Sequence, residues 1–132
     1  MNYSLDELNL LTHDIIECCI EVHKELGPGL LESIYEECLE TVLTEFGLDV
    51  ERQVEVPIYF IGKKLNKSFR IDMLVNNSVV LELKSVETLL PVHEAQLVSY
   101  LKLSNEKLGL LINFNSKYLK DGLRRRINGT IN

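Results

Sequence analysis

The sequence predicts an α/β fold in which a mixed β-sheet is flanked by helices. Helical periodicity dominates roughly the first 45 residues, several strand-like apolar runs follow, and one more helical segment separates the last two of these runs. A helix must bury its apolar face and a strand must bury one or both of its faces, so such elements pack in layers. The expected order of elements is ααβββαβ, followed by a basic tail.

Two helices are expected at the N-terminal end. Apolar residues recur at helical spacing over residues 5–26, and Ser4 is a suitable N-cap. The Gly-Pro-Gly sequence at 27–29 then ends this helix. A second helix is expected over residues 30–45, with Gly47 closing it.

Four strands and a third helix are expected in the remainder. Residues 54–61 alternate as a strand, and the turn at Gly62 leads into a long second strand that ends near residue 75. Residues 79–86 form the third strand. A helix opened by Pro91 then extends to about residue 103, and the apolar run over residues 107–114 is typical of a strand buried on both faces.

The apolar residues of the second and third strands predict how these strands pair. Side chains alternate between the two faces of a strand. One apolar row is expected to contain Phe69, Ile71, Met73 and Val75, and the other Val79, Leu81 and Leu83. The rows share a face only if Val75 faces Val79, with residues 76–78 as the loop. This register sets Asp72 opposite Glu82, and Lys84 opposite Arg70.

Opposed carboxylates at this position suggest a metal site. Like charges that face each other repel, and burying them costs more free energy unless a cation compensates. Asp72, Glu82 and a backbone carbonyl, with Leu83 as its candidate, form an oxygen-rich donor set that suits Mg²⁺ or Mn²⁺ better than zinc. Lys84 could position water for phosphodiester cleavage. A solvated polar face with a Lys84–Glu82 pair explains the same residues equally well.

Composition and charge restrict the function further. The chain of 132 residues is long enough for one domain over residues 1–132, and without a long apolar run or leader the expected location is cytoplasmic, with no membrane contact. Residues 1–51 carry thirteen acidic residues and one basic residue, which gives −12. Residues 52–132 carry thirteen basic and seven acidic residues, which gives +6. The basic half could bind a polyanion through Lys63, Lys64, Lys67 and Arg124-Arg125-Arg126, although such clusters are also typical of solvated surface.

Motifs from separate parts of the chain together resemble a known family. The segment Gly29-Leu30-Leu31-Glu32-Ser33-Ile34-Tyr35 is similar to the signature of the GxxExxY proteins, and the likeness extends from about residue 15 to Arg125-Arg126. This resemblance implies the PD-(D/E)XK nuclease superfamily and its restriction-endonuclease-like αβββαβ core, here with an extra N-terminal helix. The proline of the superfamily name is Ile71 in this chain.

The same resemblance implies roles for individual residues. Asp72, Glu82 and Lys84 would form the catalytic triad, and Glu32 would add an acid from the second helix. His23 would match an upstream histidine that completes the metal shell. Gln96-Leu97-Val98-Ser99-Tyr100 resembles the QxxxY element of RecB-like nucleases, so the expected substrate-binding residues are Gln96, Tyr100, Tyr35 and Arg70.

The sequence therefore predicts a nuclease that depends on Mg²⁺ or Mn²⁺ and acts on nucleic acid, with DNA preferred over RNA. A homodimer or a protein partner is expected to help choose the target. The alternative is a non-catalytic module of the same fold that binds nucleic acid or a protein. The complete Asp/Glu/Lys set favours the first interpretation, whereas the acidic N-terminal half favours the second. Spacing alone also explains His23 and Glu32 as residues that compensate helix dipoles.

Overall fold

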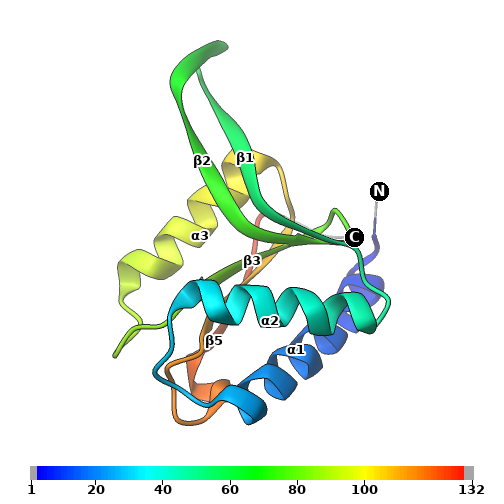
Figure 1. The fold of residues 1–132 in the computed structure, drawn as a ribbon. Coiled ribbons are helices and arrows are strands. Elements are labelled where there is room, and N and C mark those ends of the chain that lie inside the picture. The colour runs from blue at the N-terminus through cyan, green and yellow to red at the C-terminus, as the bar shows by residue number, and fades with distance from the viewer. Residues whose placement is uncertain (1–2, 130–132) are drawn as a thin grey trace.

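A mixed five-stranded sheet with helices on both faces forms the protein, which a computed structural model describes over residues 3–129 (Figure 1). Its elements are α1 (Leu5–Leu26), α2 (Glu32–Glu45), β1 (Val50–Phe60), β2 (Lys63–Val75), β3 (Val79–Lys84), α3 (Pro91–Ser104), β4 (Leu108–Asn113), the 3₁₀ helix η1 (Leu119–Gly122) and β5 (Leu123–Ile127). No helix within the described residues is long and apolar enough to cross a membrane.

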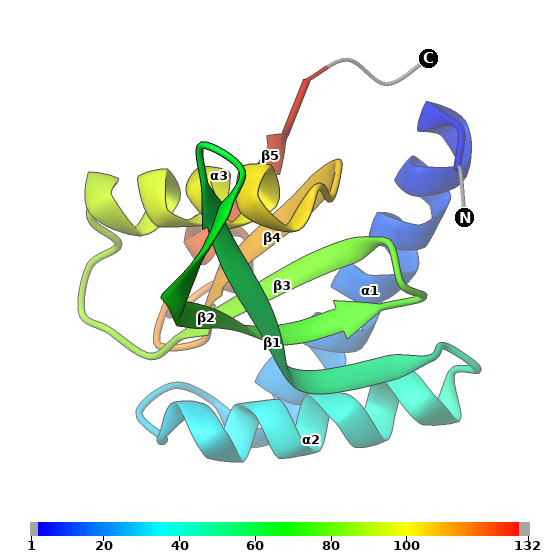
Figure 2. The ribbon, with the colours of Figure 1, turned by 90° about the horizontal axis from the view of Figure 1, so that it is seen from above.

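The strands lie in the order β1-β2-β3-β4-β5. β3 and β4 are parallel and are connected through α3, while the other neighbouring pairs are antiparallel. One apolar core lies between the sheet and α1 with α2, and a smaller one lies under α3 on the opposite face (Figure 2). The predicted αβββαβ core with an additional N-terminal helix is confirmed.

Several element boundaries differ from the sequence expectation. Ser4 caps α1 as expected, with its hydroxyl accepting the Glu7 N–H at 3.2 Å. β1 begins at Val50 instead of residue 54, because its first residues pair with the end of β2. The segment expected to be a basic tail contains strand β5. Its three consecutive arginines hide the apolar alternation that would identify a strand, and its position depends on backbone pairing with β4.

The predicted register of β2 against β3 is confirmed. Val75 pairs with Val79, and the pairing continues to Met73 opposite Leu81. Asn76 and Asn77 in the connecting loop adopt left-handed conformations, with φ of 49° and 52°. Asparagine tolerates this region better than most residues, so the loop fits the register that the apolar pattern requires.

The single apolar row expected along β2 is wrong, because β2 changes face at Asp72. Met73 and Val75 pack against α1 and α2, whereas Ile71 belongs to the core under α3. The pairing of β1 with β2 is interrupted at the same level, where Gln53 lies opposite Asp72 and has a φ of 51°. Beyond this bend β2 leaves β3, so Arg70 does not pair with Lys84.

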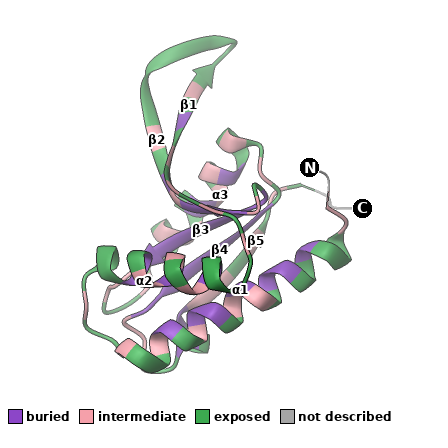
Figure 3. Cartoon of the chain, turned by 45° about the vertical axis from the view of Figure 1, so that its right-hand side comes forward, coloured by how far each residue is buried: buried purple, intermediate pink, exposed green. Residues whose placement is uncertain are grey.

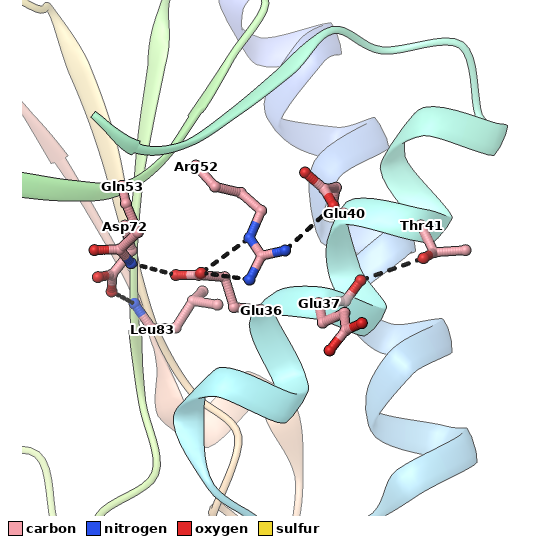
Figure 4. A network of polar contacts seen from close by, with 8 residues as sticks. All are labelled: Glu36, Glu37, Glu40, Thr41, Arg52, Gln53, Asp72 and Leu83. Atoms are coloured by element: carbon pink, nitrogen blue, oxygen red, sulfur yellow. Dashed lines mark hydrogen bonds and ion pairs between the residues drawn. The ribbon is translucent and has the colours of Figure 1, made fainter.

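A polar network holds the bend against α2 (Figure 4). Gln53 Nε2 donates to Glu36 Oε1 at 2.8 Å, and Arg52 Nε and Nη2 both lie 3.0 Å from Glu36 Oε2. Arg52 Nη1 also reaches Glu40 Oε1 at 3.3 Å. A left-handed conformation costs a residue with a Cβ about 1 kcal/mol or more. These contacts with the buried Glu36 compensate for that cost at Gln53.

Removing the arginine of this network should destabilise the fold. Arg52→Ala should lower the free energy of unfolding by about 1–3 kcal/mol, because Glu36 stays buried without its charged donors. Urea unfolding measures this change. The matched control is Arg125→Ala, which removes an exposed arginine bonded to Asn9 and should change the value by less than about 0.5 kcal/mol. Equal losses in the two variants would contradict a special role for the network.

Candidate functional site

Asp72 and Glu82 approach each other where β2 separates from β3. Asp72 Oδ2 accepts the backbone N–H of Leu83 at 2.8 Å (Figure 4). In a continued antiparallel ladder the register would give this N–H to the backbone of Ile71. Because β2 bends away, the Asp72 carboxylate accepts this N–H in place of the Ile71 carbonyl. The carboxylate is therefore held at the edge of β3, beside the residue that follows Glu82.

Glu82 is the most unusual ionisable group near this edge. Its side chain is 6% exposed, and its Oε1 is the buried side-chain atom without a hydrogen-bond partner within residues 3–129. Burial, followed by the negative charge of Asp72, raises the pKa of Glu82 to about 9. The ammonium group of Lys84 counters this shift only in part. An isolated buried carboxylate is unfavourable, so this position favours either a proton or a bound cation.

A backbone carbonyl also faces the gap between β2 and β3. Lys84 accepts the N–H of Phe114 at 2.9 Å, so its carbonyl points toward β4. Successive peptide groups of a strand point to opposite sides. The Leu83 carbonyl consequently points toward β2, where its own N–H meets Asp72. The register would have given this carbonyl the N–H of Ile71, which the bend carries away.

Lys84 lies at the end of β3, where neighbouring segments fix the backbone. It is half-buried and pairs with Asn113 of β4. The Asn113 amide bonds both polar groups of Val86, accepting its N–H at 3.1 Å and donating to its carbonyl at 2.9 Å. These contacts fix the backbone just after Lys84, and the pairing with β4 fixes Lys84 itself. The position of the Lys84 Cα is therefore well defined.

The expected α3 residues lie on the same side of the sheet as the acids. The Tyr100 ring stacks on Phe69 of β2, with centroids 4.2 Å apart. Burial and the nearby charges of Glu82 and Asp72 raise the pKa of Tyr100, while a hydrogen bond with Gln96 lowers it. Gln96 and Tyr100 therefore lie beside the carboxylate pair, although they are distant from it in the sequence.

Tyr35 has a different role from the expected one. It is completely buried, its ring stacks on Phe114 at 4.6 Å, and its hydroxyl donates to the Gly27 carbonyl at 2.6 Å. The same hydroxyl accepts the Leu30 N–H at 3.2 Å. Tyr35 thus has no surface for a substrate, and it instead fixes the loop in which Gly29 adopts a φ of 99°.

Glu32 and His23 also hold helix ends to neighbouring loops. Glu32 Oε2 accepts the N–H of Ser85 at 3.0 Å, directly after Lys84. His23 Nε2 lies 2.7 Å from the Ser116 carbonyl oxygen, to which it can donate. Nδ1 is then the nitrogen through which His23 would ligate a metal, and that role stays a prediction. Within residues 3–129 no three His, Cys, Asp or Glu side chains cluster as metal ligands. A site made of two carboxylates and a carbonyl is consistent with that finding.

The basic residues considered for nucleic acid fall into two groups. Arg124 and Arg126 both pair with Glu94 of α3, at 3.0 and 2.9 Å, whereas Arg125 bonds Asn9 on the other side of the sheet. Strand alternation therefore splits this cluster, and the single negative charge of Glu94 balances one of its three positive charges. Arg70 is exposed and lies opposite Glu55, away from Lys84.

Some residues important to the site had no recognisable sequence signal. Gln53 matters through a backbone conformation that its residue type does not favour, and its contact with Glu36 joins segments seventeen positions apart. Asn113 appears in the sequence as the polar end of an apolar strand. Its anchoring of Val86 becomes visible only when β3 and β4 are paired.

Comparison with known proteins agrees with the fold. The crystal structure of SSO0001 is similar, with 29% sequence identity, a TM-score of 0.50 and a match over 76% of this chain and 50% of that one. The chain thus corresponds to half the length of SSO0001. No curated protein matches significantly. A family model described as the PD-(D/E)XK nuclease superfamily matches residues 9–126, which include Asp72, Glu82 and Lys84. The chain therefore belongs to the PD-(D/E)XK nuclease superfamily.

Proposed function

We propose that the protein is a nuclease that requires Mg²⁺ or Mn²⁺ and hydrolyses phosphodiester bonds of DNA. The observation that carries this proposal is the buried Glu82 carboxylate, whose Oε1 lacks a partner beside Asp72. Nucleases of this superfamily generally use divalent metal ions. A cation would offset the unfavourable free energy of the buried Glu82 carboxylate next to the half-buried Asp72.

The donor set fits a hard divalent cation. The three donors are all oxygen atoms, which Mg²⁺ and Mn²⁺ prefer; they come from Asp72, Glu82 and the carbonyl of Leu83. This set contains no thiol or imidazole. A bound ion would supply Lewis acid chemistry by polarising the scissile phosphate. Gly29 lies in the loop before α2, and Glu32 and Tyr35 lie in the first turn of α2. Glu32 contacts the chain at the exit of β3, which supports a proposed relationship with the GxxExxY proteins.

The remaining residues would position water and substrate. The Lys84 ammonium group would orient the attacking water and stabilise negative charge that develops on the phosphate. The Gln96 amide and the Tyr100 hydroxyl would donate to the nucleic acid beside the carboxylates. Glu32 would act as a positioning residue, because its bond to the Ser85 N–H holds the chain directly after Lys84.

Metal binding should stabilise the protein through the two carboxylates. Mn²⁺ should raise the melting temperature of the wild type, since a ligand that binds only the folded state stabilises it. Asp72→Asn should lose this response. Without metal and above about pH 9, where Glu82 is ionised, it should melt higher than the wild type, because one of two repelling charges is gone while an oxygen remains for Leu83. Thermal melts with and without Mn²⁺ measure both effects.

The control for this experiment is Asp121→Asn, at an exposed position of η1. It should respond to Mn²⁺ like the wild type. An unchanged response in Asp72→Asn would place the ion elsewhere in the protein.

Lys84 should matter for cleavage more than for metal binding. Lys84→Ala should keep the Mn²⁺-dependent rise in melting temperature and lose cleavage by about 10²-fold or more, the usual scale for a positioned acid–base group. The assay uses labelled single- and double-stranded DNA and RNA at saturating concentration. Lys102→Ala, at an exposed lysine of α3, should cleave like the wild type.

Two outcomes of this assay would contradict parts of the proposal. If Lys84→Ala cleaves at the wild-type rate, the role assigned to Lys84 is wrong. If the wild type binds Mn²⁺ through Asp72 but cleaves none of the four substrates, the protein does not act as a nuclease by itself. A non-catalytic binding module would then be the better account.

A further inference from the structure

Beyond the bend, β1 and β2 continue as a two-stranded projection, residues 54–71, which we call the arm. It extends away from the sheet and past α3 (Figure 1). Most of the arm is exposed, in contrast to the buried strands β3 and β4 (Figure 3). The part near the bend packs on α3 through Phe69 and Tyr100, whereas the distal part contributes nothing to either core. Core packing therefore does not explain the distal arm.

The arm is a basic element of an acidic protein. It carries four basic residues and a single acid, a net charge of +3, whereas the whole chain has −6. The acid, Glu55, accepts the Ser68 hydroxyl at 2.9 Å. None of the four basic residues forms an ion pair within the described part of the chain; they are Lys63, Lys64, Lys67 and Arg70. Their charge is available to an anionic partner.

Part of this charge surrounds a hollow that contains further hydrogen-bond donors. Lys64, Asn66, Lys67 and Ser68 line the hollow together with Glu55, Pro57 and Leu65. Ammonium, amide and hydroxyl groups are the usual donors to backbone phosphates. Because the Ser68 hydroxyl donates to Glu55, the donors that the hollow offers to a phosphate backbone are the ammonium groups of Lys64 and Lys67 and the amide of Asn66.

The tip of the arm is apolar, exposed and strained. Tyr59, Phe60 and Ile61 are 58%, 64% and 88% exposed. Ile61 has a φ of 50°, in the left-handed region that a β-branched residue rarely adopts. Neither the exposure nor the strain at Ile61 stabilises the fold, and such outliers tend to occur at binding elements.

We propose that the arm binds the major groove of a DNA duplex, which makes double-stranded DNA the substrate of the carboxylate site. This inference rests on the proposed function. The major groove of B-form DNA, about 12 Å wide, admits a two-stranded β-ribbon. The major groove of A-form RNA is too narrow for side chains to enter. Single strands offer no groove for the ribbon, although they share the phosphate charge.

The reach of the arm suits a duplex that also contacts the site. Asp72 lies at the base of the arm and Gly62 at its tip, ten positions apart. Ten residues in a strand span at most about 33 Å, which is close to one turn of B-form DNA at about 34 Å. One duplex could therefore contact the tip and present a phosphate to Asp72 and Glu82.

The acidic helices of a second copy are the competing partner for a basic arm. Charge alone would fit them as well, since residues 1–51 carry −12. The Asn66 amide in the hollow favours phosphates, because it adds a hydrogen bond that an ionic contact with carboxylates would not require. We therefore assign the arm to DNA and let the oligomeric state test the alternative.

The arm lysines should contribute to duplex binding in a salt-dependent way. The combined variant Lys63→Ala, Lys64→Ala and Lys67→Ala should bind a labelled 20-base-pair duplex at least about 10-fold more weakly at low salt. The slope of log affinity against log salt should fall by about 2 to 3, since each lost phosphate contact removes about 0.9. Fluorescence anisotropy in EDTA measures binding without cleavage. The control removes the same number of exposed lysines elsewhere, at Lys102, Lys107 and Lys120, and should have a smaller effect.

The tip provides a second variant that should fold at least as well as the wild type. Ile61→Asn should raise the melting temperature or leave it unchanged, because asparagine tolerates a positive φ, and it should weaken duplex binding. Weaker binding together with lower thermal stability would point to damage of the fold, and the tip would then lose its assignment.

Three results would overturn the inference. The lysine variant could bind the duplex like the wild type, or it could lose affinity equally for single-stranded DNA and double-stranded RNA. Light scattering could also show that the wild type is a dimer and the lysine variant a monomer with unchanged DNA affinity, which would assign the arm to a second copy. The Mn²⁺ response should persist in the arm variants. Duplex binding through the arm without any cleavage would contradict the nuclease proposal, and with it the assignment of the duplex as substrate, and would leave only the binding of duplex DNA by the arm.

Discussion

The buried Glu82 and the half-buried Asp72 lie next to each other beside β3, where their carboxylates repel each other when both are ionised, and the surrounding structure keeps them together. Asp72 is tied to the backbone of Leu83, and Glu82 is buried with a free oxygen and a raised pKa. Such a pair opposes folding unless a proton or a cation is bound. This unfavourable free energy arises at β3, the central strand of the sheet. Asn113 and Glu32 hold the segment that follows β3 in place. A locally destabilising arrangement in an otherwise well-packed protein is typical of a functional site.

The bend at Gln53 and Asp72 connects this pair to the rest of the molecule. If β2 continued its pairing, Ile71 would satisfy the backbone of Leu83 and the Asp72 carboxylate would not accept the Leu83 N–H. Because β2 turns away, the Asp72 carboxylate and the Leu83 carbonyl share the gap, Phe69 reaches Tyr100, and the distal hairpin leaves the sheet as the arm. Glu36 stabilises the bend from α2 through Gln53 and Arg52. The same distortion thus creates the candidate metal site and directs the candidate DNA-binding element.

Much of the fold could be predicted from the sequence because local patterns and global packing agree. The pairing of Val75 with Val79 follows from apolar alternation, and the helices follow from their periodicity and caps. The change of face at Asp72 could not be predicted, because a regular strand was assumed and Gln53 does not favour a positive φ. The proximity of Asp72, Glu82 and Lys84 follows from the correct register. Tyr35 was misjudged because spacing along the chain gives no information about burial.

The central claim is that Asp72 and Glu82 together form a binding site for a divalent cation. Titration calorimetry with Mn²⁺ on the wild type and on Glu82→Gln tests it most directly, because glutamine keeps the shape of the side chain and removes its charge. The matched control is Glu87→Gln, at an exposed position shortly after β3. The account predicts binding to the wild type and the control, and at least about 10-fold weaker binding to Glu82→Gln, a loss of about 1.4 kcal/mol or more. Equal Mn²⁺ affinity in Glu82→Gln and the wild type would contradict it.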